Sequence, residues 1–153
     1  MTTFSASVAS TAVVAAPRQQ IWEILTDPDQ LVAMTPFLCA IDARGDTWTW
    51  RMQPVKGVGV GLRPEFTESM SFDDQRHIGF THAPPTGQDE RVGAEGTYDL
   101  ADDPGGTKLS ITLDVTVDLP LPRASRRAVE AVMRRTMDTM GKRFSANLIR
   151  AVA

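Results

Sequence analysis

A carboxylate and an imidazole interrupt an apolar pattern in FTESMSFDDQRHIGFTH, residues 66–82. Apolar residues alternate on both sides of a central turn, which is typical of two antiparallel strands with one buried face. A register that pairs Phe72 with Ile78 keeps the apolar residues on one face and places Glu68 opposite His82 on that same face. Directly opposed Cβ atoms lie about 5 Å apart. The spacing therefore predicts a polar pair on a buried surface.

Such a pair is compatible with three roles. It can orient a hydroxyl or carbonyl group of a ligand, or it can serve as an acid and a base. It can also be a structural cross-strand bond near the end of the sheet, because His82 adjoins the loop APPTG, and the sequence favours this third role. Burial raises the pKa of a carboxyl group and a nearby imidazolium lowers it, so the sequence leaves the direction of the shift for Glu68 open.

Aromatic and sulfur-containing side chains complete the candidate site. Tyr98, the single tyrosine, has inward parity and would need a partner for its hydroxyl if it were buried. It can join the polar pair, but the sequence favours an ordinary core tyrosine. Trp48 and Trp50 share one face, as a wall for a ring-shaped ligand or simply as core. Three methionines form a stripe on a predicted C-terminal helix. Methionine fits irregular shapes, so the stripe suits a pliable pocket wall or simply the core. No catalytic residue is assigned, and the predicted ligand-binding set is Glu68, His82, Tyr98, Trp48, Trp50, Phe66, Met70, Phe80, Met133, Met137 and Met140.

The elements that position these residues follow from periodicity. After a first strand, Pro17 and Asp27 indicate the starts of two short helices. Apolar residues at three- and four-residue steps predict a long helix after Pro122. We therefore expect an α+β fold in which a curved seven-stranded antiparallel sheet wraps around a long C-terminal helix, as one domain over residues 1–153. The expected strands are 4–14, 38–43, 46–52, 62–72, 76–82, 90–100 and 107–120, and the glycine-rich stretch 53–61 is expected to be a hairpin flap.

The chain has 153 residues, is 42% hydrophobic and carries a formal net charge of −3, which suits a globular domain. Its charge is uneven, because residues 123–153 hold eight basic and two acidic side chains and the remainder has a net charge of −9. A basic face can attract nucleic acid or anionic lipid. No aromatic residues alternate with the arginines, as a single-strand binder needs, so a solvated helix face is favoured and no nucleic-acid partner is expected.

The remaining features concern compartment and cofactors. No apolar run approaches the roughly 18 residues of a membrane span, and the first residues lack a secretory pattern. We expect a cytoplasmic protein with Cys39 buried as filler. GVGVG is not a phosphate loop, since no Gly-Lys-Ser/Thr follows it. With two separated histidines and one cysteine, we expect no metal and no cofactor. Whether the protein is a monomer or a homodimer is left open.

The element order resembles that of the START-like superfamily, also called SRPBCC. The matching segments are APRQQIWEILTDPDQLVAMTP near the start, GTYDL and GGTKLSITL later, and the long C-terminal helix. The superfamily contains polyketide cyclase/dehydrase and lipid-transport domains, and the resemblance covers essentially the whole chain. It implies a helix-grip fold with a deep apolar cavity. Relatives bind lipids or hormones or cyclise aromatic polyketides, so the fold alone does not determine function.

The predicted function is binding of a small hydrophobic or aromatic ligand, lipid- or polyketide-like, in a cavity between the sheet and the C-terminal helix. One alternative is an aromatase/cyclase-like enzyme that acts on a polyketide. A second alternative is an interaction or stress-related protein with a vestigial cavity and a contact surface on the basic helix. The predicted pocket has few polar groups, which favours binding over catalysis.

Overall fold

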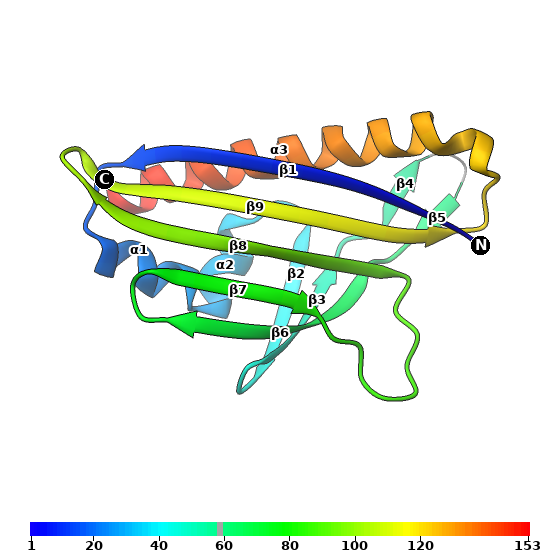
Figure 1. Ribbon diagram of the computed structural model, residues 1–153, viewed down its shortest axis with the longest axis horizontal. Helices are drawn as coiled ribbons and strands as arrows, with labels where there is room; N and C mark the ends of the chain where they lie inside the picture. Colours follow the sequence, from blue (N-terminus) through cyan, green and yellow to red (C-terminus); the bar gives the residue numbers. More distant parts are fainter. Residues whose placement is uncertain (58–59) are drawn as a thin grey trace.

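The computed structural model describes residues 1–57 and 60–153 (Figure 1). The helices are α1 (Arg18–Leu25), α2 (Pro28–Met34), the single 3₁₀ turn η1 (Arg123–Ser125) and α3 (Arg126–Val152). The strands are β1 (Thr2–Val14), β2 (Leu38–Arg44), β3 (Thr47–Met52), β4 (Val55–Gly57), β5 (Val60–Leu62), β6 (Glu65–Asp73), β7 (His77–His82), β8 (Val92–Asp103) and β9 (Gly106–Leu119).

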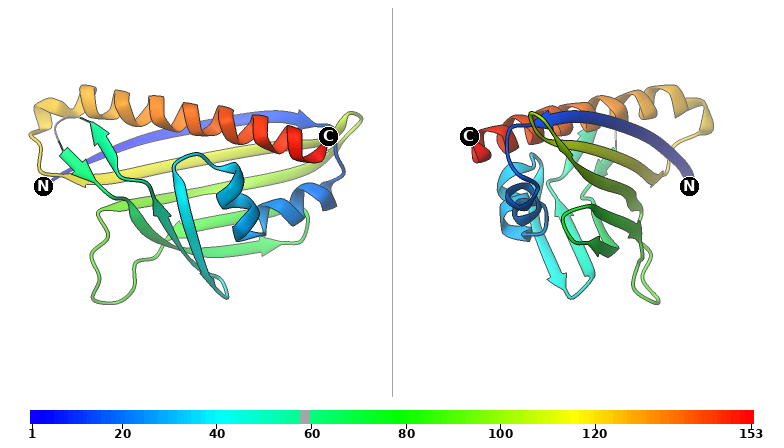
Figure 2. Two further views of the ribbon diagram at one scale, coloured as in Figure 1. Left: turned by 180° about the vertical axis from the view of Figure 1, so that it is seen from behind. Right: turned by 60° about the vertical axis from the view of Figure 1, so that its left-hand side comes forward.

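Seven strands form one antiparallel sheet in the order β1-β9-β8-β7-β6-β3-β2. The sheet curves into a trough, α3 lies along its open side, and α1 and α2 cover one end (Figure 2). The predicted fold class is confirmed. Among the described residues, none of the helices combines the length and apolar character needed to span a bilayer.

Local sequence explains the two short helices. Pro17 precedes the first residue of α1 with extended backbone, and proline has no backbone N–H to leave unpaired at a helix start. Pro28 likewise occupies the first position of α2. The Asp27 side chain accepts hydrogen bonds from the N–H groups of Asp29 and Gln30 at 3.0 and 3.5 Å. These caps place both helices directly after β1, as the sequence predicted.

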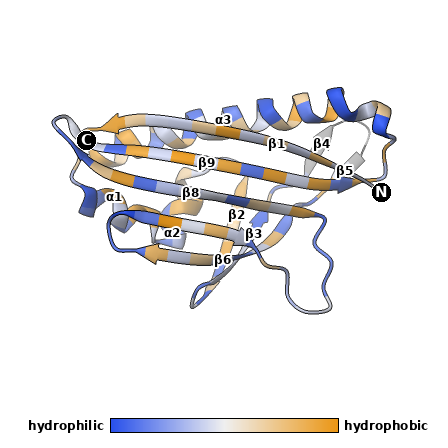
Figure 3. Cartoon of the chain, viewed as in Figure 1, coloured by the Kyte–Doolittle hydropathy of each residue, from blue (hydrophilic) through white to orange (hydrophobic). Residues whose placement is uncertain are grey.

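The core consists of two clusters inside the trough. One joins α1, α2 and the C-terminal half of α3 to β3, β6, β7, β8 and β9. The other joins the N-terminal half of α3 to the opposite end of the sheet. Trp50 and Leu113 pack against both clusters, so they lie at the junction. Polar and apolar residues alternate along β9, which gives the sheet one buried and one wet face (Figure 3).

Two expectations about the strands need correction. Cys39 is exposed, because Leu38 takes the buried position of β2 and its neighbour points to the other face. The strand expected over 62–72 is split, since β5 ends at Leu62 and β6 begins at Glu65. Pro64 lies in the gap, and proline cannot donate to a strand ladder. β4 and β5 pair as a hairpin, but residues 58 and 59 of the expected flap lie outside the described residues.

Candidate functional site

Glu68 lies in the middle of the sheet with its side chain in the trough. It pairs with Trp48 of β3 on one side and with His82 of β7 on the other. The predicted register of β6 and β7 is confirmed at every apolar pair from Phe72↔Ile78 onward. Only 2% of Glu68 is exposed. A carboxyl group therefore sits where an apolar residue would normally complete the core.

The Glu68 carboxyl is buried, and one of its oxygens is unpaired in the described part of the chain. Its Oε2 atom makes no hydrogen bond with any described residue, and the indole Nε1 of nearby Trp50 is equally unsatisfied. Burial raises the pKa of Glu68 to about 8, and the charge of Glu95 acts in the same direction. The Trp50 indole opposes this shift without reaching hydrogen-bonding geometry. At neutral pH the carboxyl is consequently protonated, and it presents a donor and an acceptor to the interior.

His82 lies opposite Glu68 in the ladder, as predicted, but its imidazole is bonded to a different carboxylate. The Nε2 atom of His82 lies 2.9 Å from Oε1 of Glu90. Its ring rests against Gly93, where a Cβ atom would collide with the imidazole. His82 bonds to Glu90 because β7 ends at His82 and the loop that follows brings Glu90 back beside this imidazole. The missing side chain at position 93 is the sequence signal for this arrangement.

Glu90 is the site-adjacent residue that the sequence analysis missed. Its carboxylate accepts hydrogen bonds from the backbone N–H and from the Oγ1 of Thr67, both at 2.7 Å. Only 8% of the Glu90 side chain is exposed, and Thr67 is also buried. Together with His82 these residues form a latch that fastens the β7–β8 loop to β6. The latch is structural, because its side chains are paired with one another.

Aromatic rings surround Glu68 on both flanks. Trp50 stacks on Phe66 with a centroid distance of 6.2 Å, and Trp48 lies 6.1 Å from Trp50. On the other flank Phe80 and Tyr98 are 5.7 Å apart. Burial, and then the nearby Glu68, raises the pKa of Tyr98, so its hydroxyl stays protonated. The structure brings Met70 into the same core cluster as Phe80.

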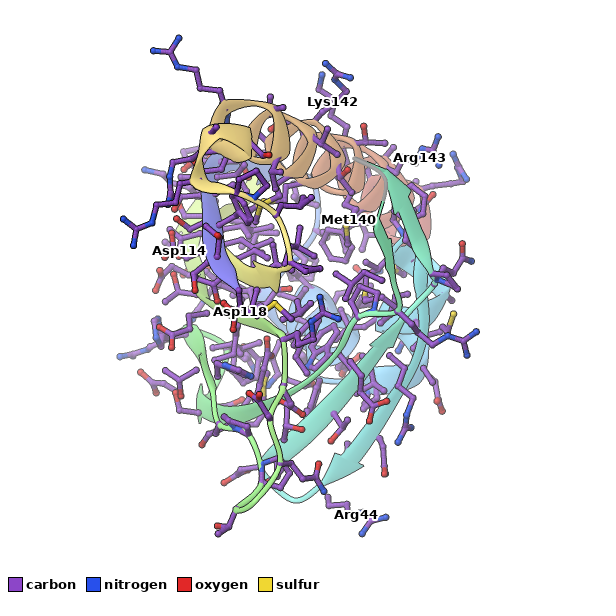
Figure 4. All side chains as sticks on the ribbon, turned by 90° about the vertical axis from the view of Figure 1, so that its right-hand side faces the viewer. Arg44, Asp114, Asp118, Met140, Lys142 and Arg143 are labelled. Carbon is purple, nitrogen blue, oxygen red and sulfur yellow. The ribbon has the colours of Figure 1, made fainter. Side chains whose placement is uncertain are left out.

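The three methionines of α3 line the side of the helix that faces the sheet. Met137 is buried, whereas Met133 and Met140 are half-buried. Met133 packs against the second core cluster. Met140 points from α3 toward the interior (Figure 4). The predicted stripe thus forms one wall above the trough, and its role toward a ligand stays a prediction.

Two pockets in the described part of the chain lie away from Glu68. One, of about 340 Å³, is bounded by residues 61–65 and 88–92. The other, of about 560 Å³, lies between the start of α1 and the turn that joins β8 to β9. Neither is lined by the aromatic residues around Glu68. Trp48, which pairs with Glu68 across β3 and β6, is buried in the first core cluster together with Met70 and Phe80.

Comparisons with known proteins identify the family. Residues 5–152 match the family described as polyketide cyclase / dehydrase and lipid transport. The chain belongs to this family. No curated protein sequence matches it. Similar solved structures share the fold at low sequence identity, so they add nothing on function by themselves.

Three of these structures illustrate the range of the fold. A START superfamily protein from Mycobacterium smegmatis has a TM-score of 0.68 at 18% identity, with 95% of this chain and 96% of that chain covered. A protein from Thermus thermophilus has a TM-score of 0.66 at 16% identity, with 99% of this chain and 100% of that chain covered. The di-domain ARO/CYC StfQ from the steffimycin biosynthetic pathway has a TM-score of 0.68 at 12% identity, with 97% of this chain and 51% of StfQ covered.

Proposed function

We propose that this member of the polyketide cyclase / dehydrase and lipid transport family binds a small hydrophobic or aromatic molecule, lipid- or polyketide-like, between the sheet and α3. The single observation that carries the proposal is the buried carboxyl of Glu68, whose Oε2 atom has no hydrogen-bond partner among the described residues. An unsatisfied buried polar group costs about 1–3 kcal/mol relative to a paired one. A ligand group that bonds to this carboxyl would recover that cost upon binding.

The surroundings of Glu68 suit an apolar ligand with one polar group. Aromatic rings flank the carboxyl on both sides, and apolar burial contributes about 25 cal/mol per Å². The neutral carboxyl and the Trp50 N–H can donate to a carbonyl or hydroxyl oxygen. His82 holds Glu90 and is assigned to the latch, whereas Tyr98, Trp48, Phe66, Met70 and Phe80 form the proposed wall.

Entry of a ligand requires side chains above the trough to move. The methionines of α3 are suited to this, because an unbranched thioether side chain changes rotamer at low cost. Met133 and Met140 are only half-buried. We infer that these two side chains withdraw and that the aromatic wall of the sheet stays in place.

Native mass spectrometry of the purified protein, followed by extraction of the bound material, tests the proposal. We expect a retained small molecule of low polarity. Thermal shift with that molecule, or with a panel of phenols, ketones and fatty acids if none is retained, then compares wild type with Glu68→Gln and with the exposed control Glu23→Gln. A ligand must raise the melting temperature of the wild type and of Glu23→Gln more than that of Glu68→Gln. Equal shifts in all three proteins would remove Glu68 from the site.

A second candidate function is cyclisation of a polyketide. The observation that favours it is the same carboxyl, because an acid with a pKa of about 8 holds its proton at neutral pH and can pass it to a ketone oxygen. Turnover of an aromatic polyketide precursor by the wild type, lost in Glu68→Gln while ligand affinity is kept, would support an enzyme. Affinity without turnover would support a binding protein.

A further inference from the structure

One side of the molecule carries a row of cations along a single helix. Five exposed basic residues follow the outer face of α3 over most of its length, and we call them the α3 cation stripe: Arg127, Arg134, Arg135, Lys142 and Arg150. Arg127 and Arg134, and likewise Arg135 and Lys142, are seven residues apart, Arg150 follows Lys142 by eight, and Arg135 directly follows Arg134. At 3.6 residues per turn these five positions lie within one half of the helix circumference. At 1.5 Å per residue the stripe extends for about 35 Å.

The described residues do not pair with the cations of the stripe. None of its five cations forms an ion pair with a described residue. Asp138 is the one acidic residue of α3 on the same face, so the net charge of the face is +4. The other two cations of α3, in contrast, interact with side chains of the protein itself. Arg126 bonds to Glu130, and Arg143 lies over the ring of Phe37.

Acidic residues gather on a different side of the molecule. Asp114 and Asp118 project from the outer face of the sheet, whereas Lys142 points away from the sheet on the far side of α3 (Figure 4). Both aspartates bond to β1 side chains rather than to the stripe, Asp118 to Thr3 and Asp114 to Ser7. A flat anionic surface that contacts the outer face of α3 would therefore meet the cations and would not approach the carboxylates of Asp114 and Asp118.

We propose that the α3 cation stripe docks the protein on the surface of an anionic lipid bilayer. Five long cationic side chains spread over one half of the helix along this length can extend their charged ends to lipid headgroups together. The residues between the cations are compatible with this, because Ala128 and Ala146 are small and Ile149, 54% exposed beside Arg150, can enter the headgroup region. No aromatic side chain lies in the stripe to stack on the bases of a single-stranded nucleic acid.

Docking in this orientation places the wall formed by α3 next to the bilayer. Attachment of this kind depends on the charges of the outer face of α3 and is independent of the molecule that the interior binds.

Co-sedimentation of the full-length protein with vesicles tests the proposal. Vesicles of phosphatidylcholine alone are compared with vesicles of equal parts phosphatidylcholine and phosphatidylglycerol, at about 0.05 M and about 0.5 M salt. We expect binding to the anionic vesicles only, and loss of binding at high salt. Each cation near such a surface contributes about fivefold to the partition coefficient. The double variant Arg134→Glu/Lys142→Glu should therefore lower it by at least about tenfold.

The matched control reverses two exposed charges elsewhere. Arg44→Glu/Arg76→Glu changes the net charge equally, and these residues lie in or next to the β2–β3 and β6–β7 turns, away from α3. This control should keep binding within about threefold of wild type, because only long-range charge is altered. Equal losses in both double variants would overturn the proposal. The proposal would also be overturned if the wild type did not bind anionic vesicles at low salt. This holds even if the stripe were found to bind duplex DNA.

Discussion

The protonation of Glu68 links the stability of the fold to pH at the scale of a single residue. Burial raises the pKa of this carboxyl from 4.5 to about 8. Between these values the folded protein holds a proton that the unfolded chain has released. The stability associated with the neutral carboxyl is therefore fully present below the unfolded pKa, and it is lost as the pH rises through the folded pKa.

Urea denaturation over this pH range measures the effect. We expect the free energy of unfolding of the wild type to fall by several kcal/mol more than that of Glu68→Gln, because one pKa unit corresponds to about 1.4 kcal/mol. Glu23→Gln removes an exposed carboxyl of α1 and should keep the slope of the wild type. Parallel profiles for wild type and Glu68→Gln would mean that the carboxyl is ionised in the fold.

Glu90 is a second single residue whose removal should change the free energy of unfolding. Glu90→Ala removes the acceptor for His82 and for both donors of Thr67. We expect a loss of about 3 kcal/mol in the free energy of unfolding, because buried donors are left unpaired and the lost bonds involve a charged group. Amide hydrogen exchange gives a local readout, since the N–H of Thr67 should exchange much faster.

The neighbouring Asp89 supplies the control for that experiment. It is exposed, and the hydrogen bonds of the latch run through Glu90 instead. Asp89→Ala should change the free energy of unfolding by less than about 0.5 kcal/mol and leave the exchange of Thr67 unaltered. Protection of the Thr67 amide in Glu90→Ala would show that the latch does not hold this strand.

At the scale of elements, two glycines lie in opposite packing environments: Gly96 is tightly enclosed in the sheet, and Gly141 lies on an open face of α3. A Cβ atom at Gly96 of β8 would overlap the carbonyl of Thr112 on β9 and the ring of Phe80. Gly96→Ala should therefore cost about 2 kcal/mol or more. Gly141 of α3 has open space around it, and Gly141→Ala should add about 1 kcal/mol, because alanine is the better helix former. Thermal denaturation compares the two, and changes of the same sign would contradict this account.

The elements themselves were largely predictable because their signals are local. The period of two in 66–82 determined the register of β6 and β7, since a slip of one residue would expose every apolar side chain. The starts of α1 and α2 followed from Pro17 and Asp27. The break at Pro64 was missed, although proline is a poor strand residue, because the alternation continues across it.

The candidate site was only partly predictable, because its geometry depends on contacts between elements that are distant in sequence. Parity placed Glu68 on the buried face. It did not reveal that His82 bonds to Glu90 at the end of β7, since this depends on the path of the loop that returns Glu90. The packing of the interior likewise depends on how α3 meets the sheet, which no local pattern specifies.

At the scale of the whole molecule, the open sheet has two edges, β1 and β2, and an uncovered edge invites pairing with another chain. The start of α3 covers part of the β1 edge. Glu130 accepts a hydrogen bond from the N–H of Ser5 at 2.8 Å, and Arg126 donates to the carbonyl oxygen of Thr3 at 3.4 Å. These two side chains take up backbone groups that a strand of a second molecule would use.

Removal of this cover should promote association. We expect Glu130→Ala to lower the free energy of unfolding by about 1–2 kcal/mol and to shift the protein toward larger species as its concentration rises, as measured by size-exclusion chromatography with light scattering. Asp138→Ala removes the same charge from an exposed position of the same helix and should leave the mass distribution of the wild type unchanged. If Glu130→Ala and Asp138→Ala elute alike at every concentration, the β1 edge is protected by the length of α3 rather than by this pair of contacts.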